Sequence, residues 1–349
     1  MIRLGIIGGG NIVRTRHLAA IASFGSRIRV AGISDTHRER ADDLARRHAI
    51  ARTAANADTA LSDVPWMDDV DAVLVATPPF AHGQLVLAAL ERGKHVLVEK
   101  PFVLDLDEGR RAIELAQRRG LILAVNHNFQ YSRAFTNLRA DLERERLGTI
   151  GSAYSLQLSN DQRRLPAWSE RLPLGLFYDE SPHVFYLLRA FAGRDTVLRS
   201  AYCVAPSDPR KSTPHTLDLQ LTSGAVPASI HIDFESPICE WTFVLLGERG
   251  LGCVDLFRDI YTYLPHDGQH LMREVLATSG LATLAHWRGF AQNGWSYVRH
   301  RLYYGFDRIY ANFVNAVESG DPSHVAAHDG AEGLAVNLLQ HAAVESASG

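Results

Sequence analysis

Short apolar runs alternate with helical patterns in the first third of the chain. The apolar runs are rich in Ile, Val and Leu, and they span residues 2–8, 29–35, 70–79, 94–101 and 120–128. The segments between them space their apolar residues as amphipathic helices do, over 36–49, 82–93 and 108–120. Nearly continuous apolar strands separated by amphipathic helices are typical of a parallel sheet covered on both faces. We therefore expect an α/β domain with a parallel sheet over residues 1–125.

The pattern changes after residue 128. One more helix is predicted over 133–148, ended by Gly148. Alternating apolar and polar positions follow in four long runs, at 151–161, 196–206, 215–236 and 240–257. Two runs contain turn signals, Ser223-Gly224 and residues 247–250, and such turns join antiparallel hairpins. Residues 308–346 are expected to form two helices around a Gly-Asp-Pro turn. We therefore expect a second α/β domain over 126–349, with a mainly antiparallel sheet.

Length and composition fit a globular protein of two domains. The chain has 349 residues, more than one core usually serves, and 46% of them are hydrophobic. The net charge is −3 and no basic block is present, so nucleic acid is not expected as a partner. Cys203, Cys239 and Cys253 show no paired spacing. We therefore expect no disulfide framework, no metal site and a cytoplasmic location.

A membrane is not expected as a partner either. The N-terminus is apolar but short and runs into glycines, which does not fit a secretory signal. No apolar run approaches the roughly 18 residues that a spanning helix needs. Residues 281–306 mix aromatic side chains with Arg and His. We expect this segment to be docked or to face another copy of the chain, with an interfacial helix as the alternative.

A glycine triplet follows the first apolar run directly. Gly8 and Gly10 supply the first two glycines of the G-x-G-x-x-G pattern, where the first permits a tight turn and the second lets a pyrophosphate approach the backbone. Val13 occupies the third position, so the following helix either packs less closely or starts differently. We expect the pyrophosphate of a dinucleotide on residues 8–12, including Asn11 and Ile12.

An acid, Asp35, ends the second apolar run, 25 residues beyond Gly10. A carboxylate at this position can accept hydrogen bonds from both hydroxyls of an adenosine ribose, and it repels a 2′-phosphate. It therefore favours NAD, while Arg38 and Arg40 keep NADP as the alternative. The alternative is that Asp35 has a structural role, as the N-cap of the helix that begins near His37. One carboxylate can fill both roles.

The segment from Ala76 to Phe102 carries a specific resemblance. Thr77, Pro78 and Pro79, then His82, then GKHVLVEKP over 93–101, are similar to the signature of the Gfo/Idh/MocA oxidoreductases. The resemblance implies a Rossmann domain followed by an α/β domain with a large open sheet, which often mediates dimers or tetramers. It also implies a cofactor at the strand ends, near Thr77, Pro78 and His82.

Lys100 belongs to the E-K-P part of this signature. The resemblance implies that this lysine contacts both the nicotinamide region and the substrate. The chemistry agrees, because an ammonium group among apolar residues can hydrogen-bond an alcohol oxygen and stabilise developing negative charge. Glu99 is expected to orient the lysine or to contact the nicotinamide ribose. The alternative is that Glu99 and Lys100 are a solvated pair at the start of a loop.

Residues 175–193 resemble the D-x-G-x-H-x-x-D segment of the same family. Asp179 and His183 match it, four residues apart and hence on one face of a helix. The resemblance makes His183 the catalytic acid/base, with Asp179 beside it, and an imidazole titrates near neutrality as this role requires. Ser181-Pro182 replaces the glycine, and Tyr186 replaces the final Asp. The alternative is a core or capping histidine.

These residues together predict an NAD(P)-dependent dehydrogenase or reductase of a secondary alcohol on a sugar, sugar derivative or cyclitol. The expected substrate contacts are Lys100, Asn126, Asp179, His183 and Tyr186. Asn126 is included because it follows the fifth strand, at the ligand-binding edge of the sheet. The rivals are an NAD-dependent glycoside hydrolase on the same fold and a non-catalytic nucleotide-binding protein. A homodimer or homotetramer is expected.

Overall fold

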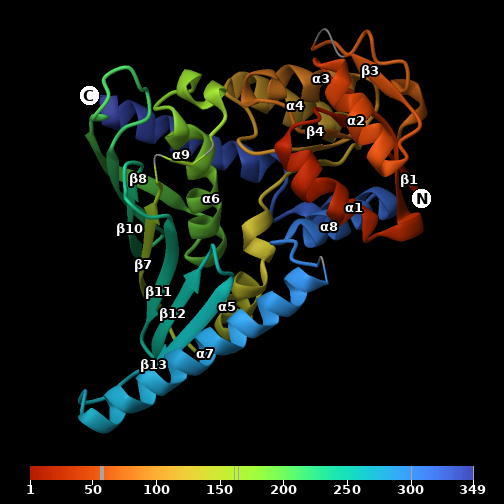
Figure 1. Ribbon diagram of the computed structural model, residues 1–349. Helices are drawn as coiled ribbons and strands as arrows, with labels where there is room; N and C mark the ends of the chain where they lie inside the picture. The colour runs from red at the N-terminus through yellow and green to blue at the C-terminus, as the bar shows by residue number, and fades with distance from the viewer. Residues whose placement is uncertain (56–58, 161, 164, 300, 349) are drawn as a thin grey trace. The chain divides into compact units, whose positions relative to one another are not determined.

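A computed structural model describes residues 1–55, 59–160, 162–163, 165–299 and 301–348 (Figure 1). The chain divides into two compact units, Met1–Asn128 with Phe306–Leu338, and Phe129–Gly305 with Leu339–Gly349. The segment Phe306–Leu338 thus packs with the first unit, although the sequence pattern grouped it with residues 126–349. Two residues of predicted segments, Asp161 and His300, lie outside the described residues.

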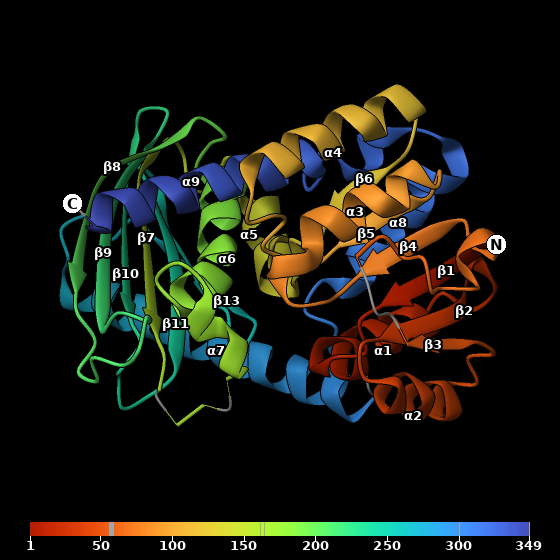
Figure 2. The same ribbon diagram turned by 90° about the horizontal axis from the view of Figure 1, so that it is seen from above.

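The first unit contains a six-stranded sheet in the order β3-β2-β1-β4-β5-β6, and every neighbouring pair is parallel. Its strands are β1 (Ile2–Ile7), β2 (Ile28–Asp35), β3 (Thr53–Ala55), β4 (Ala72–Val75), β5 (His95–Val98) and β6 (Leu123–Val125). Its helices include α1 (Leu18–Ala22), α2 (Arg38–His48), α3 (His82–Glu91) and α4 (Leu106–Arg119). Figure 2 shows α3 and α4 on one face of the sheet and α1 and α2 on the other. The predicted parallel sheet with helices on both faces is confirmed.

The strand order reverses between β1 and β4. Open α/β sheets bind ligands at such a switch point, outside the carboxyl ends of the strands. Almost all residues of β4, β5 and β6 are buried, because helices cover both faces of the sheet. The chain therefore delivers Gly8, Thr77, Glu99 and Asn126 to one edge of the sheet, each just beyond its strand.

The sequence pattern missed strand β3. Thr53–Ala55 is a three-residue edge strand whose sequence, TAA, has neither an apolar run nor an alternating pattern. It is held by backbone pairing with β2, in which Thr53 lies opposite Ile33. A strand that depends on its neighbour more than on its own side chains leaves little signal in the sequence.

The C-terminal segment forms the expected helices α8 (Phe306–Ser319) and α9 (Gly330–Ser348). Between them, Asp321 begins a short 3₁₀ turn (Pro322–Val325) and accepts a hydrogen bond from the Ser323 amide at 2.9 Å. Helix α8 buries Ile309, Tyr310 and Phe313 and contacts α1 in the first unit. This apolar face explains why the chain returns to the first unit after residue 305.

The second unit contains a seven-stranded sheet in the order β13-β12-β11-β7-β10-β9-β8. Its strands are β7 (Ile150–Leu158), β8 (Thr196–Val204), β9 (Thr216–Ser223), β10 (Val226–Asp233), β11 (Glu240–Gly247), β12 (Gly250–Asp255) and β13 (Ile260–Pro265). Neighbouring strands are antiparallel except β7 and β10, which are parallel. The predicted, mainly antiparallel sheet is confirmed. Strand β13 was not predicted, because it lies beyond the last predicted run of alternating residues, which ends at residue 257.

Helices α5 (Arg133–Glu143) and α6 (Leu176–Phe191) pack against one face of this sheet (Figure 1). Phe135 of α5 and Phe191 of α6 both contact Phe243 of β11, with ring centroids 5.6 and 6.3 Å away. Helix α5 ends at Glu143, earlier than the predicted end at Gly148, because the chain turns through Glu145 and Gly148, both at positive φ.

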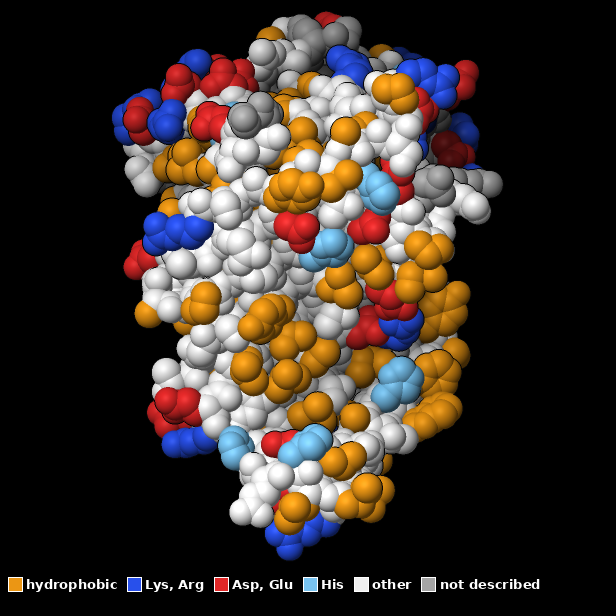
Figure 3. All heavy atoms as spheres, turned by 90° about the vertical axis from the view of Figure 1, so that its left-hand side faces the viewer, with side chains coloured by type: hydrophobic (Ala, Val, Ile, Leu, Met, Phe, Trp, Pro, Cys, Tyr) orange, Lys and Arg blue, Asp and Glu red, His pale blue; other side chains and the backbone are white. Residues whose placement is uncertain are grey.

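The opposite face of the sheet exposes apolar side chains. Strand β7 alternates in burial, so Tyr154 and Leu156 point outward and are 47% and 41% exposed. Tyr202 of β8 and Leu246 of β11 are exposed as well. Figure 3 shows hydrophobic side chains gathered over this part of the surface. The long helix α7 (Met272–Val298) runs along β13 and has no buried residue, and its Leu276 and Trp287 are exposed.

Candidate functional site

The glycine-rich loop has the geometry of a pyrophosphate cradle. Gly8 has a φ of +99°, and a Cβ there would collide with the Ala76 carbonyl oxygen at the end of β4, so only glycine fits. Gly10 differs, because a Cβ there would meet no protein atom within 4 Å. Helical structure begins at Asn11 and Ile12. The close approach at Gly8 and the open space at Gly10 are what a dinucleotide loop needs.

Val13, in place of the third glycine, comes with an altered helix start. Its side chain is fully buried, and residues Val13–His17 form a π-helical turn before α1 begins at Leu18. Of the two expectations for this departure, the structure shows the second: the helix starts differently. The wider π turn also brings His17 inside the unit.

Asp35 joins the glycine loop to the start of α2. One carboxylate oxygen, Oδ2, accepts the Gly9 amide at 2.7 Å, and the other, Oδ1, accepts the His37 amide at 2.8 Å. The guanidinium of Arg40 lies 3.8 Å from Oδ1. The helix cap position itself is His37, so Asp35 shapes the turn before the cap. Each carboxylate oxygen can accept a further hydrogen bond, so Asp35 can also bind the hydroxyls of a ribose.

His82 ties two strand ends together. It is fully buried, and its ring nitrogens lie 2.8 Å from the carbonyl oxygens of Thr77, beyond β4, and of Pro101, beyond β5. Burial lowers the pKa of His82, against the smaller opposing effect of these carbonyls. Its contacts therefore hold the loops that would border a cofactor.

Glu99 and Lys100 are not a solvated pair. The Glu99 side chain is buried, and its Oε1 accepts hydrogen bonds from His17 Nε2 at 2.7 Å and from Asn126 Nδ2 at 2.6 Å. Its Oε2 accepts the Lys100 amide at 3.2 Å. Burial alone would raise the pKa of Glu99, but the His17 hydrogen bond, the charge of Lys100 and the Asn126 hydrogen bond outweigh it and lower the pKa. These hydrogen bonds hold the E-K-P motif, Glu99 to Pro101, in place just beyond the end of β5, and we call this motif the E-K-P corner.

Sequence reasoning missed two residues of this corner, His17 and Tyr310. His17 is fully buried, and its Nδ1 lies 2.8 Å from the hydroxyl of Tyr310, which is also fully buried on α8. Burial, and secondarily the charge of Glu99, raise the pKa of Tyr310 well above its usual range. No local signal links residues 293 positions apart, although His17 follows the glycine loop within two helical turns.

The buried polar atoms without a hydrogen-bond partner in the described part of the chain include two near the ends of β4 and β6. They are Oδ1 of Asn126, a residue only 1% exposed, and Oγ1 of Thr77. Buried polar atoms are nearly always hydrogen-bonded, so an unsatisfied pair at a ligand edge favours a polar ligand there. Together with the open space at Gly10, they fit a dinucleotide that runs from the glycine loop toward the ends of β4 and β6.

The second unit holds His183 inside an aromatic group. His183 and Asp179 lie one turn apart on α6, as predicted. The ring of His183 lies 4.8 Å from that of Phe129 and 5.6 Å from that of Trp241. Its Nδ1 is 2.8 Å from the hydroxyl of Tyr186, and this hydroxyl oxygen also accepts the Phe129 amide at 3.1 Å. The Tyr186 hydroxyl therefore links the His183 ring to the backbone at Phe129.

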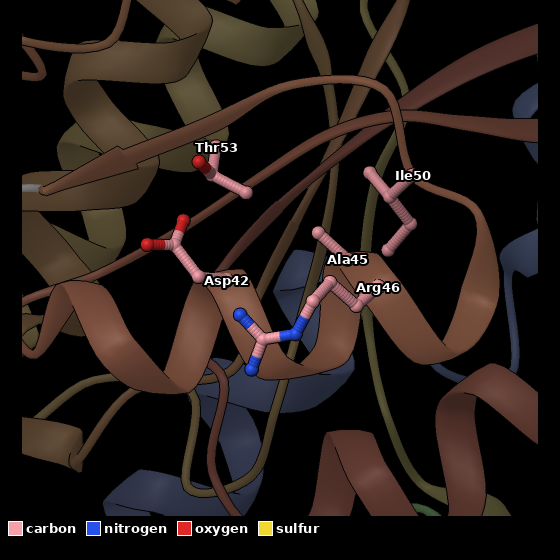
Figure 4. Close-up of a pocket in the computed structure, with 5 residues that line it drawn as sticks. All are labelled: Asp42, Ala45, Arg46, Ile50 and Thr53. Carbon is pink, nitrogen blue, oxygen red and sulfur yellow. The ribbon is translucent and has the colours of Figure 1, made fainter.

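A separate surface pocket lies on the first unit, away from these residues (Figure 4). It is a shallow hollow of about 280 Å³ lined by Asp42, Ala45, Arg46, Ile50 and Thr53, which belong to α2, β3 and the link between them. None of the predicted site residues lines it.

Among the described residues, no group of three or more His, Cys, Asp or Glu side chains is arranged to hold a metal ion. No helix in the described ranges is long and apolar enough to cross a membrane.

The strand order, the glycine loop and the acid that ends β2 define the first unit as a dinucleotide-binding Rossmann domain. Residues 2–127 match the family model described as "Oxidoreductase family, NAD-binding Rossmann fold" (GFO_IDH_MocA). These residues are therefore similar to the Gfo/Idh/MocA oxidoreductase family. The resemblance inferred from the sequence is confirmed, and so is the expectation of a nicotinamide dinucleotide cofactor.

Two curated relatives are similar in sequence to part of this chain. A 1,5-anhydro-D-fructose reductase of Ensifer adhaerens is 32% identical over 148 residues, which are 42% of this chain and 43% of the relative. A myo-inositol 2-dehydrogenase of Thermotoga maritima is 30% identical over 195 residues, 56% of each chain. The chain thus spans about half the length of the curated relatives that it matches.

A solved structure extends the likeness of fold to both units. The UDP-N-acetylglucosamine 3-dehydrogenase of Acidithiobacillus ferrooxidans superposes with a TM-score of 0.73, over 99% of this chain and 97% of that one. The sequences are 19% identical, so this likeness concerns the fold alone. The predicted fold class is confirmed.

Proposed function

We propose that the chain is an NAD-dependent dehydrogenase or reductase of a secondary alcohol on a sugar, sugar derivative or cyclitol. The observation that carries the proposal is the anchored E-K-P corner: Lys100 leaves the end of β5 from a backbone held by the buried carboxylate of Glu99. It stands on an NAD-binding family domain, at the edge where such sheets bind ligands. The relatives named for sugar and inositol chemistry support the substrate class.

Lys100 and His183 carry the proposed chemistry. The bound nicotinamide would accept a hydride from the alcohol carbon, or return it in the reverse reaction. Lys100 donates a hydrogen bond to the alcohol oxygen and stabilises the negative charge that grows there. His183 takes the hydroxyl proton as general base, and returns it in the direction of reduction. Asp179 and Asn126 are proposed to contact the other hydroxyl groups of the substrate.

Asp35 is expected to set the preference for NAD. Asp35→Ser should weaken NADH binding by roughly tenfold, about 1.4 kcal/mol, since it removes an acceptor for the ribose hydroxyls. The same change should bring NADPH binding closer to NADH binding, because Arg40 then faces a 2′-phosphate without a competing carboxylate. Fluorescence titration with both reduced cofactors measures this, and Asp42→Ser on α2 is the matched control. An unchanged ratio of the two affinities would rule out the ribose role.

A panel of free sugars, nucleotide-linked sugars and cyclitols tests the activity. The protein is incubated with NAD and each compound, and NADH is followed by its near-ultraviolet absorbance. Accumulating NADH supports the dehydrogenase. An NAD-dependent glycoside hydrolase would release sugar without net NADH. A non-catalytic protein would bind NAD and exchange no hydrogen with any compound.

We also propose a cytoplasmic homo-oligomer. The three free cysteines fit a reducing compartment. The outer face of the second unit's sheet exposes Tyr154, Leu156, Tyr202 and Leu246. Stable interfaces bury about 800 Å² on each partner, and this face offers apolar side chains across several strands for such a contact.

Leu156→Lys is expected to dissociate this oligomer into monomers, because it places a charge in the middle of the apolar face. Sedimentation velocity measures the mass. Leu276→Lys is the control, since Leu276 is also an exposed leucine, on α7 and 65% exposed against 41% for Leu156. If Leu276→Lys dissociates the protein and Leu156→Lys does not, the interface belongs to α7 and not to the sheet.

A further inference from the structure

A buried hydrogen-bonded chain reaches Glu99 from two residues that are not part of the expected site, His17 and Tyr310. It runs from Tyr310 to His17 to Glu99, where Asn126 and the Lys100 amide join it. We infer that His17 is a positioning residue for the proposed reaction, acting through Glu99 on Lys100. This inference rests on the proposed function and adds to it a residue that contacts neither cofactor nor substrate in that proposal.

The donors and acceptors of this chain assign the tautomer of a neutral His17 ring. An ionised Glu99 can only accept, so Nε2 of His17 donates to Oε1. In the neutral ring Nδ1 is then an acceptor, and it takes the hydroxyl proton of Tyr310 in a hydrogen bond. Glu99 accordingly receives three N–H donors, from His17, Asn126 and the Lys100 amide. Each donor favours one position of the carboxylate, and only His17 connects it to α8.

Packing leaves His17 little freedom. The ring is fully buried and lies edge-on to Phe306 and Tyr310, with centroids 4.9 and 5.8 Å away. Both aromatic residues belong to α8, at the start of the segment that returns to the first unit. Helix α8 therefore fixes the imidazole, the imidazole fixes Glu99, and Glu99 fixes the backbone from which Lys100 extends.

The charges near Glu99 make this arrangement pH-dependent. The hydrogen bond from His17 and the charge of Lys100 favour the ionised carboxylate, while burial lowers the pKa of His82 and raises that of Tyr310. Because the folded-state pKa of Glu99 is lowered, the ionised carboxylate stabilises the fold above the unfolded-state pKa. This contribution is lost as the pH falls through the folded-state value.

The test compares His17→Leu, His17→Gln and a control, His95→Leu. His17→Leu leaves Glu99 without its α8-linked donor, so kcat should fall at least tenfold, while NADH affinity stays within about threefold of wild type. His17→Gln should recover most of kcat, since an amide can donate to Glu99 and accept from Tyr310. His95 accepts the Ile122 amide at the far end of β5, so its loss should lower the melting temperature without changing kcat.

Equal kcat values for His17→Leu and His95→Leu would overturn the inference, and so would a His17→Gln variant no better than His17→Leu. If His17→Leu does not fold, Tyr310→Phe removes a single hydroxyl and should lower kcat in the same direction.

Two readouts do not need a substrate. Long-range ¹H–¹⁵N spectra should show the Nε2–H form of His17. The gap in melting temperature between wild type and His17→Leu should close on acidification. If no compound in the panel reacts but both readouts hold, the proposed function has failed and the network has not. If the spectra show the Nδ1–H form, the positioning inference fails.

Discussion

Replacing Lys100 with methionine is expected to lower kcat by roughly 10²–10³-fold while NADH binds with nearly unchanged affinity. Methionine keeps the length and apolar body of the side chain but offers the alcohol oxygen no donor. Glu99 would still receive the amide of residue 100, so the strand end should keep its shape. Steady-state kinetics with the best compound of the panel and fluorescence titration with NADH measure the two effects.

Lys94→Met is the matched control for this variant. Lys94 lies just before β5, at the end opposite to Lys100, and its Nζ donates to the carbonyl oxygen of Val70 at 2.9 Å. It should therefore lose some stability and no activity. Normal turnover by Lys100→Met would remove Lys100 from the mechanism. A large loss of NADH affinity would instead make Lys100 a cofactor ligand more than a catalytic residue.

The first unit was largely predictable because its signals are local. Strands buried on both faces need continuous apolar runs, and the helices between them need an apolar stripe, so both leave a periodic pattern. Glycine at position 8 marks a backbone conformation that other residues avoid. Strand β3 was not predictable in this way, because its three residues are held by pairing with β2.

The candidate site was predicted only where a motif marked it. Lys100 was found because E-K-P stands at a strand end, but the partners of Glu99 come from residues 82 positions earlier and 27 positions later. Tyr310 enters only because α8 returns to the first unit. Such contacts depend on tertiary packing, and one sequence offers no pattern from which to infer them. The roles assigned to the site residues remain predictions.

In the second unit, the spacing of His183 and Tyr186 in the sequence already indicates that the two side chains are close. Tyr186 follows His183 by three residues, and side chains three apart on a helix lie on the same face. This spacing predicts the observed hydrogen bond between the His183 ring and the Tyr186 hydroxyl. The substrate contact expected of Tyr186 stays a prediction beside this bond. The contacts of His183 with Phe129 and Trp241 were beyond reach, since three separate elements supply these rings.

His183→Asn should lower kcat/KM by roughly 10²–10⁴-fold in the direction of alcohol oxidation, with little effect on NADH affinity. Asparagine keeps a polar group of similar size but cannot take up the hydroxyl proton. The rise of the oxidation rate with pH, which a general-base imidazole produces, should therefore disappear. A pH–rate profile of kcat/KM measures this. His286→Asn, at an exposed helical histidine of the same unit, is the control and should keep the wild-type profile.

Tyr186→Phe separates orientation from proton transfer at this site. Phenylalanine keeps the ring beside His183 but removes the hydroxyl that binds Nδ1, and it leaves the Phe129 amide without that acceptor. We expect a loss of activity smaller than that of His183→Asn, with the pH dependence still present, because the imidazole remains. If His183→Asn keeps the wild-type pH profile and rate, the proton acceptor is another group and His183 is a structural residue of the aromatic cluster.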